Sequence, residues 1–190
     1  MQLQKLNVKF FVEPPDDVPL TQFIDVFHGW IQAGDGDYHD VADYSHMQAG
    51  PGIVLVASDA NISIDETENR RGLLFNQKHQ LDGSNQERLR SVVSAALENC
   101  RKLEAEPALL GKLRFSANEA VIWVNDRLAG TNTEASFLEL KSEIEPFGKK
   151  LYGGAEISLE RNNDPGQRLH VRIKSAAAPD VKTLWQNLHN

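Results

Sequence analysis

Two histidines and two aspartates, His39, Asp40, Asp43 and His46, lie just before the turn-forming sequence Gly50-Pro51-Gly52. Neutral imidazole and carboxylate groups are common ligands of zinc, iron and manganese, and three protein ligands leave one coordination position for water. We therefore expect His39, Asp43 and His46 as a candidate site for a divalent metal, although their spacing matches no established metal motif. The alternative is that Asp40 and Asp43 accept hydrogen bonds from loop amides while the histidines pack or face solvent.

The conformation of residues 38–46 decides which of these side chains meet. In a helix, His39, Asp43 and His46 would share one face, whereas in a strand successive side chains point to opposite faces. We favour an extended segment because aspartate, tyrosine and valine residues flanked by glycines form helices poorly. The apolar run 53–56 that follows has the length of a strand.

A wider set of polar side chains forms the expected ligand-binding site: His28, Asp40, Asp43, Tyr44, Asn125 and Arg127. Asn125 and Arg127 follow an expected strand and precede a capped helix, where loops often collect ligands. The alternative is a turn in which Asn125 bonds its own backbone and Arg127 pairs with a surface acid.

Familiar catalytic motifs are absent from the sequence. It contains no Gly-x-Ser-x-Gly elbow, no His-Glu-x-x-His, no phosphate-binding Gly-x-x-x-x-Gly-Lys-Ser/Thr loop and no Gly-x-Gly-x-x-Gly turn. No complete catalytic set can be named, so the sequence leaves open whether the protein is an enzyme.

Charge and composition restrict the classes of partner. The 190 residues carry a formal net charge of -7, and an acidic surface repels phosphate backbones and anionic lipid, so we expect neither nucleic acid nor membrane as a partner. No apolar run approaches the roughly 20 residues of a membrane span, and no leader opens the chain, so we expect a cytoplasmic protein. Cys100 has no second cysteine to pair with, and we expect it to be a buried helix residue.

Several strings resemble those of a group of uncharacterised bacterial hypothetical proteins. They include VADYSH (41–46), GPG (50–52), NDRL (125–128) and LYGG (151–154), and the resemblance extends over nearly the whole chain. No activity, cofactor or fold is known for that group, so the resemblance implies no functional residues.

Hydrophobic periodicity predicts the elements that must position these side chains. Alternating apolar residues predict strands over 6–12, 61–65, 157–159 and 169–173, and a further strand that starts at 72–75 and ends around 82–83. Spacings of three and four predict helices over 20–31, 84–103, 134–147 and 180–188. Residues 113–115 and 120–124 indicate a hairpin that turns at Ala117 and Asn118. We expect His170, opposite the apolar face of its strand, to be exposed. The expected core includes Phe10, Phe27, Ile53, Leu55, Leu97 and Ile173.

Together these elements predict an α+β fold, with an antiparallel or mixed sheet and helices mainly on one face. We expect a single domain over residues 1–190, with halves 1–106 and 107–190 that could be duplicates of one βαββα unit. The expected function is that of a structural, interaction or ligand-binding protein that self-associates into a homo-oligomer. The alternative is a metal-dependent small-molecule enzyme that uses His39, Asp43 and His46.

Overall fold

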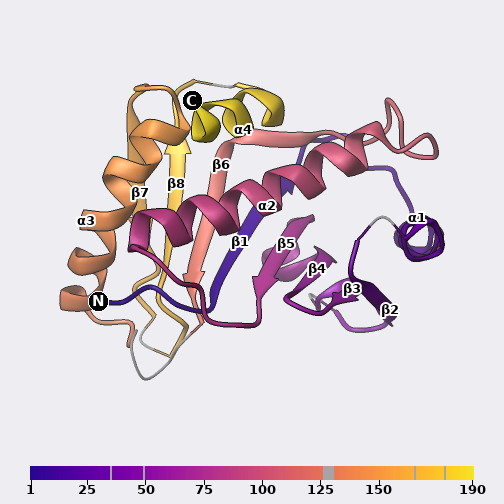
Figure 1. Cartoon of the computed structure of the whole chain (residues 1–190), viewed down its shortest axis with the longest axis horizontal. Helices are drawn as coiled ribbons and strands as arrows, with labels where there is room; N and C mark the ends of the chain where they lie inside the picture. The colour runs from indigo at the N-terminus through magenta and orange to yellow at the C-terminus, as the bar shows by residue number, and fades with distance from the viewer. Residues whose placement is uncertain (35, 49, 126–130, 165, 178) are drawn as a thin grey trace.

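The computed structural model describes residues 1–190 except 35, 49, 126–130, 165 and 178 (Figure 1). Its strands are β1 (Leu6–Val12), β2 (Tyr38–Tyr44), β3 (Gly52–Ala57), β4 (Ala60–Asp65), β5 (Gly72–Gln77), β6 (Phe115–Val124), β7 (Ile157–Arg161) and β8 (His170–Ser175). Its helices are α1 (Leu20–Ala33), α2 (Asn85–Ala105), α3 (Glu134–Leu151) and α4 (Val181–His189), with a short 3₁₀ helix, η1 (Thr67–Asn69), between β4 and β5.

All of these strands join one antiparallel sheet in the order β2-β3-β4-β5-β1-β6-β8-β7. The two halves of the chain meet where β1 of the first half pairs with β6 of the second half. Moving outward from this pair, β1 is followed by β5 and β4, and β6 is followed by β8 and β7. The two halves therefore arrange their strands in the same way on either side of the β1–β6 pair. The first half differs from a βαββα unit because it also contains β2 and β3. The α+β class and the antiparallel sheet expected from the sequence are confirmed.

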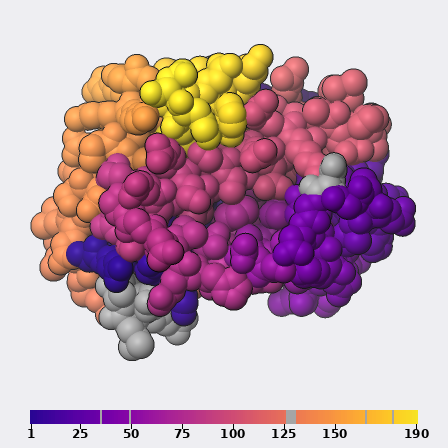
Figure 2. Space-filling model, viewed as in Figure 1, coloured from indigo at the N-terminus to yellow at the C-terminus, as the bar shows by residue number. Residues whose placement is uncertain are grey.

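The helices cover one face of the sheet. Helix α2 packs across β1 and β5, α3 packs on β7 and β8, α4 packs on β6, and α1 packs on β2 and β3. Figure 2 shows this face, where the side chains of α2, α3 and α4 form a continuous surface over the strands. None of the helices in the described ranges combines the length and the apolar character that a membrane crossing needs.

The core lies between the sheet and the helices. Ser84 caps the N-terminus of helix α2: its hydroxyl accepts a hydrogen bond from the backbone N–H of Glu87, while the Glu87 carboxylate accepts one from the backbone N–H of Ser84. Each expected core residue is fully buried, and so is Cys100. Burial raises the pKa of the Cys100 thiol well above its ordinary value.

The central stretch is extended, as favoured from the sequence, and it forms β2 at one edge of the sheet. The turn that follows brings Gly52 close to β4. Gly52 has φ +61°, and a Cβ at this position would lie 2.1 Å from the carbonyl oxygen of Ile64. Glycine is therefore required where β3 begins.

The hairpin expected at Ala117 and Asn118 is wrong, because residues 115–124 form the single long strand β6. β6 pairs with β1 through Val12–Phe115 and Phe10–Ala120, so extra β6 residues are accommodated in a bulge between these pairs. Ala117 is buried in this bulge. A bulge and a turn use similar small and polar residues, which explains the error.

Candidate functional site

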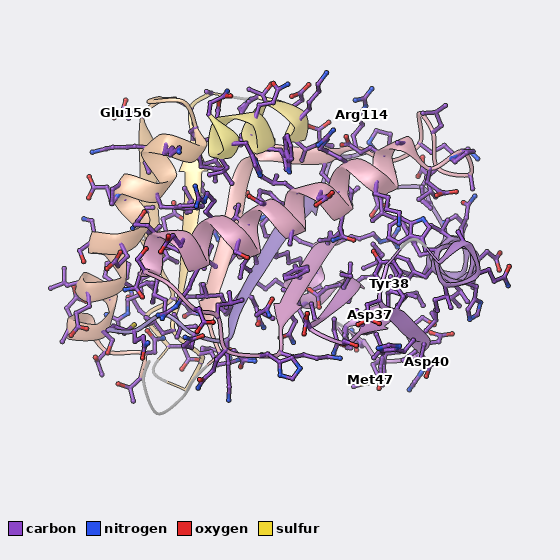
Figure 3. All side chains as sticks on the ribbon, in the orientation of Figure 1. Asp37, Tyr38, Asp40, Met47, Arg114 and Glu156 are labelled. Carbon is purple, nitrogen blue, oxygen red and sulfur yellow. The ribbon has the colours of Figure 1, made fainter. Side chains whose placement is uncertain are left out.

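The ionisable residues of β2 are satisfied locally. Asp43 Oδ1 accepts a hydrogen bond from the backbone N–H of Ser45 (2.8 Å), and Asp40 Oδ1 accepts one from the backbone N–H of Val41 (2.8 Å). The hydroxyl and backbone N–H of Ser45 lower the pKa of the Asp43 carboxyl. His39 Nε2 lies 2.6 Å from the Ser58 hydroxyl. Figure 3 shows Asp37, Tyr38, Asp40 and Met47 gathered at this end of the sheet, beside α1.

The expected metal set is not assembled. Within the described ranges, no group of three or more His, Cys, Asp and Glu side chains is placed to hold a metal ion. Four residues of extended strand span about 13 Å, so His39 and Asp43 at the two ends of that span do not converge. The extended conformation of β2 is the physical reason why these residues remain apart.

The wider ligand set is also dispersed. Asp40, Asp43 and Tyr44 lie on the edge strand β2, and His28 is exposed on α1. Asn125 follows β6, and four strands separate β6 from β2. Arg127 lies outside the described residues. Asn125 lies at the rim of a separate hollow, which is described next. Its Oδ1 accepts a hydrogen bond there from Arg168 Nη1 (2.8 Å).

The face of the sheet away from the helices carries a row of polar side chains. Val8 and Phe10 of β1 belong to the core, so the alternating residues Asn7 and Lys9 point to the other face. Direct cross-strand pairing aligns one residue from each of β4, β5, β1, β6 and β8. In that order the row is Asn61, Asn76, Asn7, Trp123 and His170.

All residues of this row except Asn61 line the floor of a hollow of about 590 Å³, which we call the open-face hollow. Its floor residues are Asn7, Leu74, Asn76, Trp123 and His170, and its walls are Pro51, Asp65, Thr67, Glu68, Asn162, Gln167 and Arg168. A volume in this range suits a small organic ligand. The sequence carries no local signal for it, since β1, β5, β6 and β8 contribute one residue each with a polar group, namely Asn7, Asn76, Trp123 and His170.

One wall is a segment that folds back over the sheet, residues 65–71, which we call the strap. The buried Lys9 ammonium donates to Asp65 Oδ1 (2.5 Å) and to the carbonyl oxygen of Thr67 (3.1 Å). Glu68 Oε2 pairs with Arg172 Nη2 of β8 (2.7 Å). These contacts carry the strap from β4 across β1 to β8, and they bury the polar residues beneath it.

The opposite wall is the connection between β7 and β8. The Asn132 side chain is only 7 % exposed, and its Nδ2 donates to the carbonyl oxygens of Asn162 (2.9 Å) and Asp164 (2.8 Å). Its Oδ1 accepts a hydrogen bond from Arg161 Nε (2.9 Å). Asn132 therefore fixes the backbone that presents Asn162 to the hollow.

Asn7 differs from Asn132 although both are buried. Asn7 is 4 % exposed and lines the hollow, yet its Oδ1 has no hydrogen-bond partner in the described part of the chain. Oδ1 of Asn61, the residue of the same row that lies outside the hollow, also has no partner in the described part of the chain. A buried oxygen without a partner costs about 1–3 kcal/mol of stability, so each such atom in a folded protein needs an explanation.

The expectation that His170 is exposed is wrong, because only 6 % of the residue is accessible. The walls of the hollow, which come from distant parts of the chain, enclose it. Its Nδ1 lies 3.3 Å from the carbonyl oxygen of Arg168, so this nitrogen carries the proton of the neutral ring. Burial lowers the pKa of His170, and Nε2 of the neutral imidazole is then a hydrogen-bond acceptor.

A second hollow of about 600 Å³ lies between α1 and α2, beside Trp30. Its principal buried polar group is already paired, because Trp30 Nε1 donates to Glu106 Oε2 (3.0 Å). We therefore place the candidate site in the open-face hollow, where the Asn7 oxygen is unpaired.

No protein-family model matches the chain, and no curated protein matches it either. The interpretation of the open-face hollow therefore rests on its geometry.

Proposed function

We propose that this chain binds a small, uncharged polar molecule in the open-face hollow. The observation that carries the proposal is Asn7, a buried amide that lines the hollow and whose oxygen has no partner among the described residues. An apolar residue of the same shape would avoid this cost. Residues that lower stability in this way are concentrated at functional sites.

The charges around the hollow support an uncharged ligand. Asp65 is paired with Lys9, and Glu68 is paired with Arg172, so the carboxylates of the strap are already neutralised. The remaining lining is rich in side-chain amides, which offer both donors and acceptors. Such a lining orients a polar ligand without requiring a net charge on it.

The proposal is tested by a titration of the ¹⁵N-labelled chain with small neutral compounds from three classes, namely monosaccharides, nucleobases and simple amides. We expect at least one class to cause saturable shifts in the side-chain N–H signals of Asn7, Asn76 and Trp123. The Asn7→Leu variant should bind that compound about tenfold more weakly or worse, because it replaces an amide of the floor with an apolar side chain.

Asn99→Leu is the matched control. Asn99 lies on α2, on the other side of the sheet, and its Nδ2 donates to the carbonyl oxygen of Ala95 (2.8 Å). This variant should bind like the wild type. If no compound shifts the three signals, or if Asn7→Leu binds as well as the wild type, the proposal is wrong.

A further inference from the structure

We infer that the ligand of the open-face hollow is a polyhydroxylated ring, a monosaccharide or a close analogue, seated on Trp123 with its hydroxyls towards the amides. This inference rests on the proposed function and adds the chemical class of the ligand.

Trp123 supplies a single aromatic surface. It is half-buried on β6 and lines the hollow, and the His170 ring lies 5.5 Å from it with a tilt of 50°. No other Phe, Tyr or Trp is among the described residues that line the hollow. A flat nucleobase is held best between two stacking surfaces. A sugar ring has one apolar C–H face, and one aromatic ring is enough to cover it.

The polar lining complements hydroxyl groups. Asn76 and Gln167 each offer an amide donor and an amide acceptor, and His170 offers Nε2 as an acceptor. Every hydroxyl can both donate and accept, so a ring bearing several hydroxyls satisfies this mixture in many orientations. Neighbouring strands lie 4.7–4.9 Å apart, so the positions of Asn76, Asn7 and Trp123 span roughly 10 Å. This width accommodates one sugar ring with its substituents.

The electrostatics disfavour a cationic ligand. A cation would meet the guanidinium group of Arg168, whose hydrogen-bond partner is the neutral Asn125 Oδ1. The carboxylates of Asp65 and Glu68 are already paired, so a cation would have to displace Lys9 or Arg172 from them. A neutral polyol avoids this competition.

The test is a titration with methyl α-D-glucopyranoside, methyl β-D-galactopyranoside and N-acetylglucosamine, with adenine and cytosine as the competing class. We expect saturable binding of at least one sugar and a perturbed Trp123 indole signal. Trp123→Leu should weaken this binding about tenfold or more because the aromatic surface is lost. Trp185→Leu is the matched control, since Trp185 lies on α4 and stacks on His189, and it should bind as the wild type does.

The outcomes separate this inference from the proposed function. Binding of a nucleobase alone, with the Asn7 and Trp123 signals shifted, overturns the sugar class and leaves the proposed function standing. Sugar binding that Trp185→Leu weakens as much as Trp123→Leu also overturns the inference, because the sugar would then bind elsewhere. If no sugar binds, the inference fails, and if the nucleobases and simple amides also leave the three signals unchanged, the proposed function fails with it.

Discussion

His170 shows how burial at the site converts a single side chain into a pH-dependent contribution to stability. Burial is the main cause of the lowered pKa of His170, and the positive charges of Arg172 and Arg168 lower this pKa further. The carbonyl oxygen of Arg168 and the carboxylate of Glu68 act in the opposite direction and raise it, but by less. As the pH falls, the imidazole of His170 is therefore protonated at a higher pH in the unfolded chain than in the folded chain. The associated stability is complete above the unfolded pKa of about 6.5 and falls as the pH drops below it.

We therefore expect His170→Gln to reduce the loss of stability between pH 7 and pH 5. Urea unfolding of the two proteins across this range measures the difference in slope. His28→Gln, which changes an exposed histidine on α1, is the control and should leave the slope unchanged. Identical slopes for the wild type and His170→Gln would show that His170 is not held neutral by the fold.

At the scale of elements, the strap depends on the buried Lys9–Asp65 pair. Burial lowers the pKa of Lys9, while Asp65 opposes this shift. Asp65→Asn should cost about 3–5 kcal/mol because it leaves the Lys9 ammonium buried without a charged partner. Lys9→Met should also be costly. The double variant should cost clearly less than the sum of the two changes, because neither charge is then left alone.

Unfolding free energies of the two single variants and the double variant test this directly. Strictly additive effects would mean that Lys9 and Asp65 do not stabilise each other, and that the strap is held by other contacts such as Glu68–Arg172.

The same elements show what the sequence could predict. The alternation of Leu6, Val8 and Phe10 is a local pattern, and it predicted β1 correctly. It could not show that Asn7 and Lys9 are buried too, because the segments that enclose this face are the strap and the β7–β8 connection, far along the chain. The site was expected on β2 because its ionisable residues are close together in the sequence, and β2 is an edge strand. The hollow is instead lined by single polar residues from several strands that are distant in the sequence.

At the scale of the whole molecule, β2 and β7 are the edges of the sheet, and self-association through an edge stays a prediction. β2 is poorly suited to pairing, because Asp40 Oδ1 occupies the backbone N–H of Val41 and the register shifts between Tyr38 and Asp40. We therefore expect any pairing to use β7.

Sedimentation velocity at high micromolar concentration should detect a dimer. The double variant Ser158→Lys, Glu160→Lys should weaken it, because like charges would face each other across paired β7 strands. Asp40→Lys on β2 should leave it unchanged. A monomer at that concentration, or equal sensitivity to the change on β2, would contradict the prediction.

The most direct measurement of the central claim compares two buried asparagines in the absence of any ligand. Asn7 has an unpartnered oxygen in the hollow, whereas both the oxygen and the nitrogen of the Asn132 side chain are hydrogen-bonded. If Asn7 is kept for binding at a cost in stability, Asn7→Leu should raise the free energy of unfolding by about 1 kcal/mol. Asn132→Leu should lower it by about 2 kcal/mol or more, because it leaves buried groups unpaired. If Asn7→Leu instead destabilises the protein as much as Asn132→Leu does, then Asn7 is a structural residue and the open-face hollow is not a binding site.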